Sequence, residues 1–235
     1  MDKKRDHSLV DAVTLRLRKE IIDGTFQFGE ALSETRIAKR YDVSRTPVRE
    51  AFARLEQEGL VHTEAQVGTF IFTMDETQFA KLSEVRSILE VAAFTDTLNQ
   101  RKKELVDDWR RLIDQMEQAI ATGNPRAYAD ADGEFHEVLF LYAANPYLND
   151  ARRTFLAKMT AVRTRLSTTP EHMRKSLSDH KQLLSLAKAG KLSDAVKLLD
   201  KHIRNKGAKF WLANKNTPRP RTRRERIESL IDTER

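Results

Sequence analysis

The stretch SRTPVREAFARLEQEGL, from Ser44 to Leu60, decides the fold of the first part of the chain. It predicts a helix over Arg45–Glu58, because Ser44 is a residue type that caps helix N-termini and Gly59 is a residue type that ends helices. Pro47 falls in the first turn, where its missing N–H costs nothing. At about 100° per residue, one arc of this helix is apolar and consists of Val48, Ala51, Phe52 and Leu55.

A second arc of the same helix carries polar side chains near its start, displaced by roughly a third of a turn from the apolar arc. Its residues are Arg45, Thr46 and Arg49. A helix with an inner apolar face and arginines in its first turns is suited to the major groove of DNA, where arginine donates to guanine O6 and N7 or holds phosphates. We therefore interpret this segment as a recognition helix.

The sequence upstream of this helix predicts two more helices. The first begins at Ser8, where Ser8 and Asp11 resemble a capping box, and Gly24 ends it. Leu32-Ser33-Glu34 opens the second helix, and Asp42-Val43 forms the turn into the recognition helix. This order is that of a helix-turn-helix.

The sequence downstream predicts a β-hairpin. Leu60–Thr63 and Thr69–Phe72 read as two strands, and Glu64–Gly68 as the turn of a wing between them. The alternative is a helical domain with a solvated basic stripe. Three helices followed by a hairpin favour a winged helix-turn-helix that binds DNA.

Residues 44–60, with Gly29, Leu32-Ser33-Glu34 and Gly68-Thr69-Phe70, resemble the GntR family of bacterial regulators. Phe28 stands where that family usually has proline, and Thr35 stands where many members carry a DNA-contacting arginine, with Arg36 one place later. The resemblance implies DNA contacts by Arg45, Thr46 and Arg49. The further DNA-binding candidates are Arg36, Ser44, Gln66 and Gly68.

The second part of the chain is poor in glycine and proline, and its apolar residues keep helical spacing throughout. We predict an antiparallel helical bundle, a fold that places ligand and metal sites in its core. The expected helices are Glu76–Asn99, Arg101–Ala121, Arg126–Ala143, Tyr147–Leu166, Glu171–Ala189 and Ser193–Leu212.

Polar residues on the apolar arcs of three expected helices predict a metal site formed by Asp132, His136, His180 and His202. Asp132 and His136 are four residues apart, so both can reach one ion. One aspartate with three histidines suits Zn²⁺, Ni²⁺, Mn²⁺ or Fe²⁺. The alternative is that these histidines are ordinary core residues whose ring nitrogens have hydrogen-bond partners. Geometry alone favours the two interpretations about equally.

Arg86 lies on the apolar arc of the first bundle helix, and Glu90 follows one turn later. An inward guanidinium cannot lose its charge, so it must be paired. We expect Arg86 to contact an anionic effector beside the metal, with an i,i+4 ion pair to Glu90 as the structural alternative.

Five short segments of this part resemble landmarks of the FCD domain, the effector domain of the FadR subfamily within GntR. They are Arg86–Glu90, Asp132–His136, Ala143–Asn145, Asp179-His180 and Lys201–Ile203. The resemblance implies that the aspartate and three histidines bind a divalent metal, with a small carboxylate completing its coordination. It adds Asn145 to Arg86 and Glu90 as effector-binding candidates, and the full metal set argues against a fatty acyl-CoA ligand.

Length and composition bound the remaining possibilities. The 235 residues favour two domains, which we place at 1–75 and 76–212, with a basic tail at 213–235. The net charge is +7, but residues 1–75 hold 12 Lys and Arg against 13 Asp and Glu, so the placement of the arginines supports DNA binding. Without cysteine there is no thiolate metal site. With no apolar run of membrane length or signal-like N-terminus, we expect a cytoplasmic protein without a membrane partner.

These observations predict a homodimeric repressor on a palindromic operator, controlled by a small organic-acid or sugar-acid effector. Two alternatives remain: a metal-responsive regulator whose signal is the ion itself, and a metal-dependent hydrolase. His136 and Glu137 begin like a zincin helix, but Phe140 occupies the place of the second histidine. We therefore do not expect an enzyme.

Overall fold

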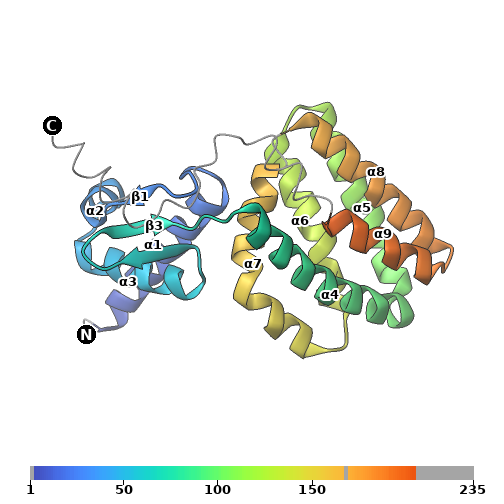
Figure 1. Cartoon of the computed structure of the whole chain (residues 1–235), viewed down its shortest axis with the longest axis horizontal. Helices are drawn as coiled ribbons and strands as arrows, with labels where there is room; N and C mark the ends of the chain where they lie inside the picture. The colour runs from blue at the N-terminus through green and yellow to red at the C-terminus, as the bar shows by residue number, and fades with distance from the viewer. Residues whose placement is uncertain (1–2, 167–168, 205–235) are drawn as a thin grey trace. The chain divides into compact units, whose positions relative to one another are not determined.

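The computed structural model describes residues 3–166 and 169–204, and the chain divides into two compact units at Asp75 and Glu76. The first unit contains three helices and three short strands within the described residues (Figure 1). They are α1 (Lys3–Ile22), β1 (Ala31–Leu32), α2 (Glu34–Tyr41), α3 (Arg45–Gln57), β2 (Val61–Glu64) and β3 (Gly68–Ile71).

The helices of the first unit surround a small apolar core. α1 packs against α3, and α2 packs against α3. The inward arc predicted for α3 is buried, and the inner face of α1 meets it. Helix α1 begins at Lys3 and not at the expected Ser8. The core side chains are Val13, Leu17, Ile21, Ile37, Val48, Ala51, Phe52 and Leu55.

Both boundaries of the helix-turn-helix have local causes. The Ser33 hydroxyl accepts a hydrogen bond from the backbone N–H of Arg36 at 3.3 Å, which caps α2. Asp42 ends α2 with φ 55°, the left-handed conformation that aspartate tolerates in tight turns. Ser44 occupies the N-cap position of α3, although its hydroxyl makes no capping hydrogen bond.

The strands form one antiparallel sheet in the order β1-β3-β2. Strands β2 and β3 make the predicted wing, with Glu64 opposite Gly68 at its tip. The sequence does not predict strand β1, because Leu32-Ser33-Glu34 indicates the start of a helix. Instead Leu32 pairs with Thr69 of β3 and its side chain is buried. Leu32 is therefore the last residue of a strand, and α2 begins only after Ser33.

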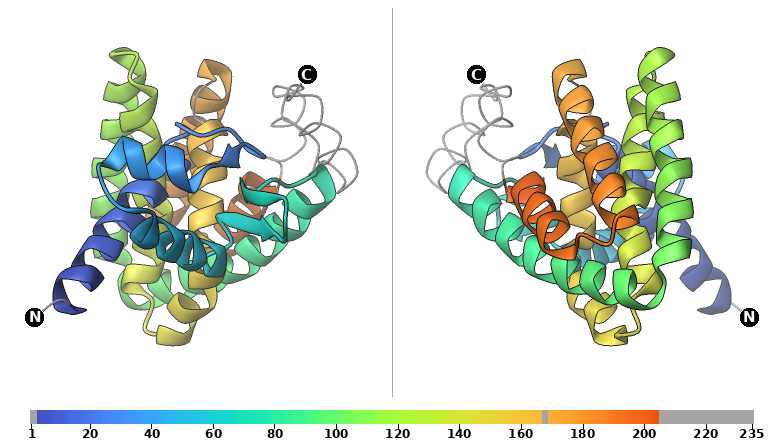
Figure 2. Two further views of the ribbon diagram at one scale, coloured as in Figure 1. Left: turned by 90° about the vertical axis from the view of Figure 1, so that its left-hand side faces the viewer. Right: turned by 90° about the vertical axis from the view of Figure 1, so that its right-hand side faces the viewer.

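The second unit consists of helices and the turns between them in its described residues. Its helices are α4 (Glu76–Gln100), α5 (Lys102–Ala121), α6 (Pro125–Tyr142), α7 (Pro146–Leu166), α8 (Pro170–Lys188) and α9 (Leu192–Arg204). Helix α5 packs on α6 and α8, while α9 packs on α4 and α8 (Figure 2). Residues 213–235, the expected basic tail, lie outside the described residues. The expected fold class, a winged helix-turn-helix followed by a helical bundle, is confirmed.

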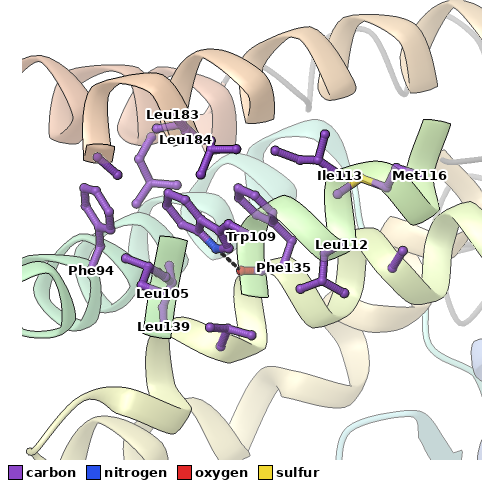
Figure 3. Close-up of a cluster of buried hydrophobic side chains, with 14 of the residues drawn as sticks. Phe94, Leu105, Trp109, Leu112, Ile113, Met116, Phe135, Leu139, Leu183 and Leu184 are labelled. Carbon is purple, nitrogen blue, oxygen red and sulfur yellow. Dashed lines mark hydrogen bonds between the residues drawn. The ribbon is translucent and has the colours of Figure 1, made fainter. Parts of the chain in front are cut away.

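The core of the second unit is built around Trp109 (Figure 3). The Trp109 ring stacks on Phe135 at 4.3 Å between centroids, and its indole N–H donates to the backbone carbonyl of Phe135 at 2.9 Å. On its other face Phe135 stacks on the His180 ring at 4.1 Å. This aromatic stack extends from the apolar core to His180 and fixes the ring orientation of that histidine.

The structure also bears on membranes. Within 3–166 and 169–204, none of the helices is both long enough and apolar enough to span a lipid bilayer.

Candidate DNA-binding surface and metal centre

The first turns of α3 present the predicted polar face. The side chains of Arg45 and Arg49 are 60% and 67% exposed, and Thr46 beside them is exposed. Pro47 and Val48 on the opposite arc are buried. Two guanidinium groups are therefore held at the surface by a helix whose other face is anchored in the core, as base readout in a groove requires.

Glu34 at the start of α2 joins these two arginines. Its carboxylate accepts from Arg45 Nη2 at 2.9 Å and from Arg49 Nε at 3.0 Å. Hydrogen bonds from Arg49 and then from Arg45 lower the pKa of Glu34 to about 2. Sequence reasoning assigned Glu34 no role in DNA binding, because its contact with α3 spans the turn between two helices.

The other DNA-binding candidates lie on the surface of the same unit. Arg36 is 57% exposed and pairs with Glu30 at 2.9 Å. Ser44 is exposed at the start of α3, while Gln66 and Gly68 are exposed at the wing tip. Gln66 adopts φ 64° and Gly68 adopts φ 142°. The conformation at position 68 is one that glycine adopts much more readily than other residues.

The three predicted metal-binding histidines meet in the core of the second unit. One ring nitrogen from each of His136, His180 and His202 lies within 4.8 Å of the other two, and all three residues are buried. The closest pair is His180 Nε2 and His202 Nε2, at 3.2 Å. Three different helices, α6, α8 and α9, thus bring three imidazoles to one place.

Glu90 determines which ring nitrogen of His136 carries the proton. The Nδ1 atom of His136 lies 2.7 Å from Glu90 Oε2. Burial lowers the pKa of His136 to about 4, so the ring is neutral near pH 7. Although burial opposes it, the charge of Arg86 and hydrogen bonds from His136 and Arg86 hold the pKa of Glu90 below its usual range. A neutral ring that donates from Nδ1 to a carboxylate leaves the lone pair of Nε2 available to a metal.

Asp132 is the fourth predicted ligand and lies beside the histidines. Its Oδ1 is 3.7 Å from His180 Nε2 and accepts from the Ser176 hydroxyl at 3.2 Å. Its Oδ2 pairs with Arg163 Nε at 3.6 Å. The carboxylate is buried, so these partners compensate for the loss of its hydration.

Arg163 was missed by sequence reasoning. It lies on α7 and is buried against Asp132. The available signal was Gly133, an unfavourable residue inside a helix. A Cβ atom at position 133 would lie 3.1 Å from Arg163 Nη2, so the glycine leaves room for the guanidinium.

His202 has a carboxylate partner of its own. Its Nδ1 atom lies 3.2 Å from Asp179 Oδ2. His136 and His202 therefore each have Nδ1 against a carboxylate. This is the arrangement that orients metal-binding imidazoles in proteins.

Two of the three effector candidates reach this centre. Arg86 and Glu90 form a buried ion pair on α4, and Glu90 links the pair to His136. Asn145 does not: it is exposed before α7, where its Oδ1 accepts from the backbone N–H of Tyr147 at 3.1 Å. Asn145 thus caps α7, and its role in effector binding stays a prediction.

The residues of the centre fit a divalent metal. Among the described residues, His136 Nε2 is a buried nitrogen without a hydrogen-bond partner, and such a group needs an explanation. Three imidazole nitrogens with one carboxylate form a donor set that suits first-row transition metals. The residues that would hold the ion are Asp132, His136, His180 and His202.

Comparison with known proteins agrees with both units. A family model described as bacterial regulatory proteins, gntR family, matches residues 9–71, and a model described as FCD domain matches residues 81–205. The gluconate operon transcriptional repressor of Bacillus licheniformis is 25% identical over 211 residues, which cover 86% of each chain.

Solved structures share the fold. A chain from Rhodococcus sp. RHA1 assigned to the GntR regulators aligns with a TM-score of 0.73 at 24% identity, over 88% of this chain and 99% of that one. The Escherichia coli protein McbR/YncC aligns with a TM-score of 0.72 at 19% identity, over 87% and 98%. The chain belongs to the GntR family of bacterial regulatory proteins, as a transcriptional regulator with an N-terminal DNA-binding domain and a C-terminal FCD domain.

Proposed function

We propose that this regulator is a repressor whose affinity for its operator falls when a small carboxylate binds beside a divalent metal in the second unit. Residues 1–75 contact DNA and residues 76–212 bind the effector. The observation that carries the proposal is the buried cluster of His136, His180 and His202, in which His136 Nε2 has no hydrogen-bond partner among the described residues and Asp132 lies beside His180.

Each residue of the centre has a part in this function. Asp132 and the three histidines hold the ion, while Glu90 and Asp179 keep two of the rings oriented through Nδ1. A metal held there would supply positive charge that binds a carboxylate. Arg86 adds a guanidinium, whose planar donors match a carboxylate.

The size and polarity of the effector follow from the same residues. A small organic acid or sugar acid presents one anionic group to the metal and Arg86. The repressor of Bacillus licheniformis named for the gluconate operon is a relative of matching length, which favours the sugar acids. A regulator whose signal is the metal itself would respond to the ion without any organic acid.

Control of DNA binding follows from linkage. If the effector binds better to an arrangement of the protein that fits the operator poorly, effector and operator each weaken the affinity for the other by the same factor. No contact between the two sites is required, only two states with different affinities.

We also propose that the species bound to DNA is a homodimer on a palindromic operator, because one recognition helix reads only a short half-site. Sedimentation velocity of the protein and of its operator complex is expected to give two chains per duplex. A single chain on the operator would contradict the dimer.

Arg86→Lys is expected to weaken the effector response about 10- to 150-fold, because a hydrogen bond to a charged group contributes about 1.5–3 kcal/mol and lysine loses the fork geometry. Metal content and operator affinity without effector stay nearly unchanged. The measurement is operator release against effector concentration, followed by fluorescence anisotropy with a panel of organic and sugar acids on metal-loaded protein.

The matched control is Arg110→Lys, an exposed arginine on α5 outside the centre. If Arg86→Lys and Arg110→Lys release DNA at the effector concentration of wild type, Arg86 is only the ion-pair partner of Glu90. If metal alone releases the operator, the ion is the signal and the carboxylate proposal is wrong.

A further inference from the structure

Ser83 is a buried polar residue of α4 that neither the metal nor the predicted effector contacts account for. It is 2% exposed, and its Oγ atom has no hydrogen-bond partner among the described residues. A buried hydroxyl without a partner costs free energy, and native proteins satisfy almost all such groups. The Ser83 hydroxyl therefore indicates a ligand that would be its hydrogen-bond partner.

Ser83 belongs to a row of polar side chains on one arc of α4. Arg86 follows after three residues and Glu90 after seven, so all three project on the same side of the helix. All three are buried. At 1.5 Å per residue the row extends about 10 Å along the helix axis, and its far end, Glu90, contacts His136 of the metal centre.

Two other polar atoms of this region are buried without a hydrogen-bond partner in the part of the chain described, like Ser83 Oγ. They are Arg86 Nη2 and His136 Nε2. The three atoms differ in chemistry: a metal-binding nitrogen, a cationic donor, and a hydroxyl that both donates and accepts. Together they match a ligand that is anionic at one end and carries a hydroxyl farther along.

We infer that Ser83 is a specificity-determining residue that hydrogen-bonds a hydroxyl of the effector, and that the effector is an extended hydroxylated acid of the aldonate class. This inference rests on the proposed effector site. The carboxylate end lies at Arg86 and the metal, and the hydroxylated chain follows α4 towards Ser83. A two-carbon acid satisfies Arg86 and the metal but does not reach Ser83.

The test compares a short hydroxy acid with long ones on Zn²⁺-loaded, full-length protein. Dissociation constants are measured by isothermal titration calorimetry for glycolate and for a set of five- and six-carbon aldonates. Wild type is expected to bind the best aldonate more tightly than glycolate. Ser83→Ala is expected to lower aldonate affinity about 3- to 10-fold, the value of one neutral hydrogen bond, and to leave glycolate affinity unchanged.

Ser87→Ala is the matched control, because Ser87 is buried on the same helix but its hydroxyl already donates to Asp200 at 2.5 Å. It is expected to leave the ratio of aldonate to glycolate affinity at the wild-type value. Three results would overturn the role of Ser83 but leave the carboxylate site in place. They are an equal loss of affinity for both acids in Ser83→Ala, no loss of affinity for either acid, and a wild type that binds glycolate more tightly than any aldonate. A wild type that binds neither class would overturn the proposed carboxylate effector itself.

Discussion

Arg49→Ala is expected to lower operator affinity by about 1–3 kcal/mol for each recognition helix, a loss of roughly 5- to 150-fold, if Arg49 makes a bidentate contact to a base. In a dimer the loss occurs twice. Folding is expected to change little, because the Arg49 side chain is 67% exposed and Arg49 is not among the buried residues of α3. Fluorescence anisotropy with labelled operator at fixed salt measures the change.

Arg54→Ala on the same helix is the control, since it removes the same charge. Arg54 pairs with Asp11 of α1, and on a helix wheel it lies about 140° from Arg49. Its loss is expected to cost far less operator affinity. Equal losses for the two variants would mean that Arg49 acts only through net charge, and unchanged binding of Arg49→Ala would remove it from the DNA-binding surface.

Removal of one histidine from the metal centre is expected to produce the second large effect. Purified wild type should carry close to one divalent ion per chain, and His180→Ala should carry almost none. At a metal concentration 100 times the dissociation constant, the ion stabilises the folded state by about 2.7 kcal/mol. Elemental analysis and thermal unfolding, each with and without a chelator, measure both quantities.

His172→Ala is the matched control, a half-buried histidine in the first turn of the same helix, α8. It is expected to retain the metal and the stabilisation by metal. His202→Ala serves as an independent variant, because a cavity at the aromatic stack under His180 destabilises the protein by itself. The metal assignment would be wrong if wild type contains no metal and does not unfold at a higher temperature when metal is added. The histidines would then be ordinary core residues.

The sequence was sufficient to predict the helices and most of the inward polar residues, because both follow from helical periodicity. The apolar arc of α3 and the inward positions of His136, His180 and His202 are set by spacing along single helices. Local periodicity also placed Arg86 and Glu90 on one face. These predictions required no knowledge of how the helices pack.

What the sequence did not predict depends on contacts between elements. Strand β1 exists because β3 pairs with it, and Arg163 enters the centre because Gly133 on another helix leaves space. Asn145 belongs to a motif, but its side chain is used to cap α7. In each case a partner distant in sequence, or a competing backbone hydrogen bond, decides where the side chain goes.

Glu34 has a consequence for the kinetics of searching along DNA. In the free protein its carboxylate already occupies the guanidinium groups of Arg45 and Arg49, much as a backbone phosphate would. Random-sequence DNA offers these arginines phosphates only, an exchange of one anion for another with little net gain. The operator also offers base edges, and those contacts add to the exchange. We therefore expect Arg45 and Arg49 to lengthen the residence time on the operator far more than on random sequence, and the dependence of affinity on salt to be shallower than without Glu34.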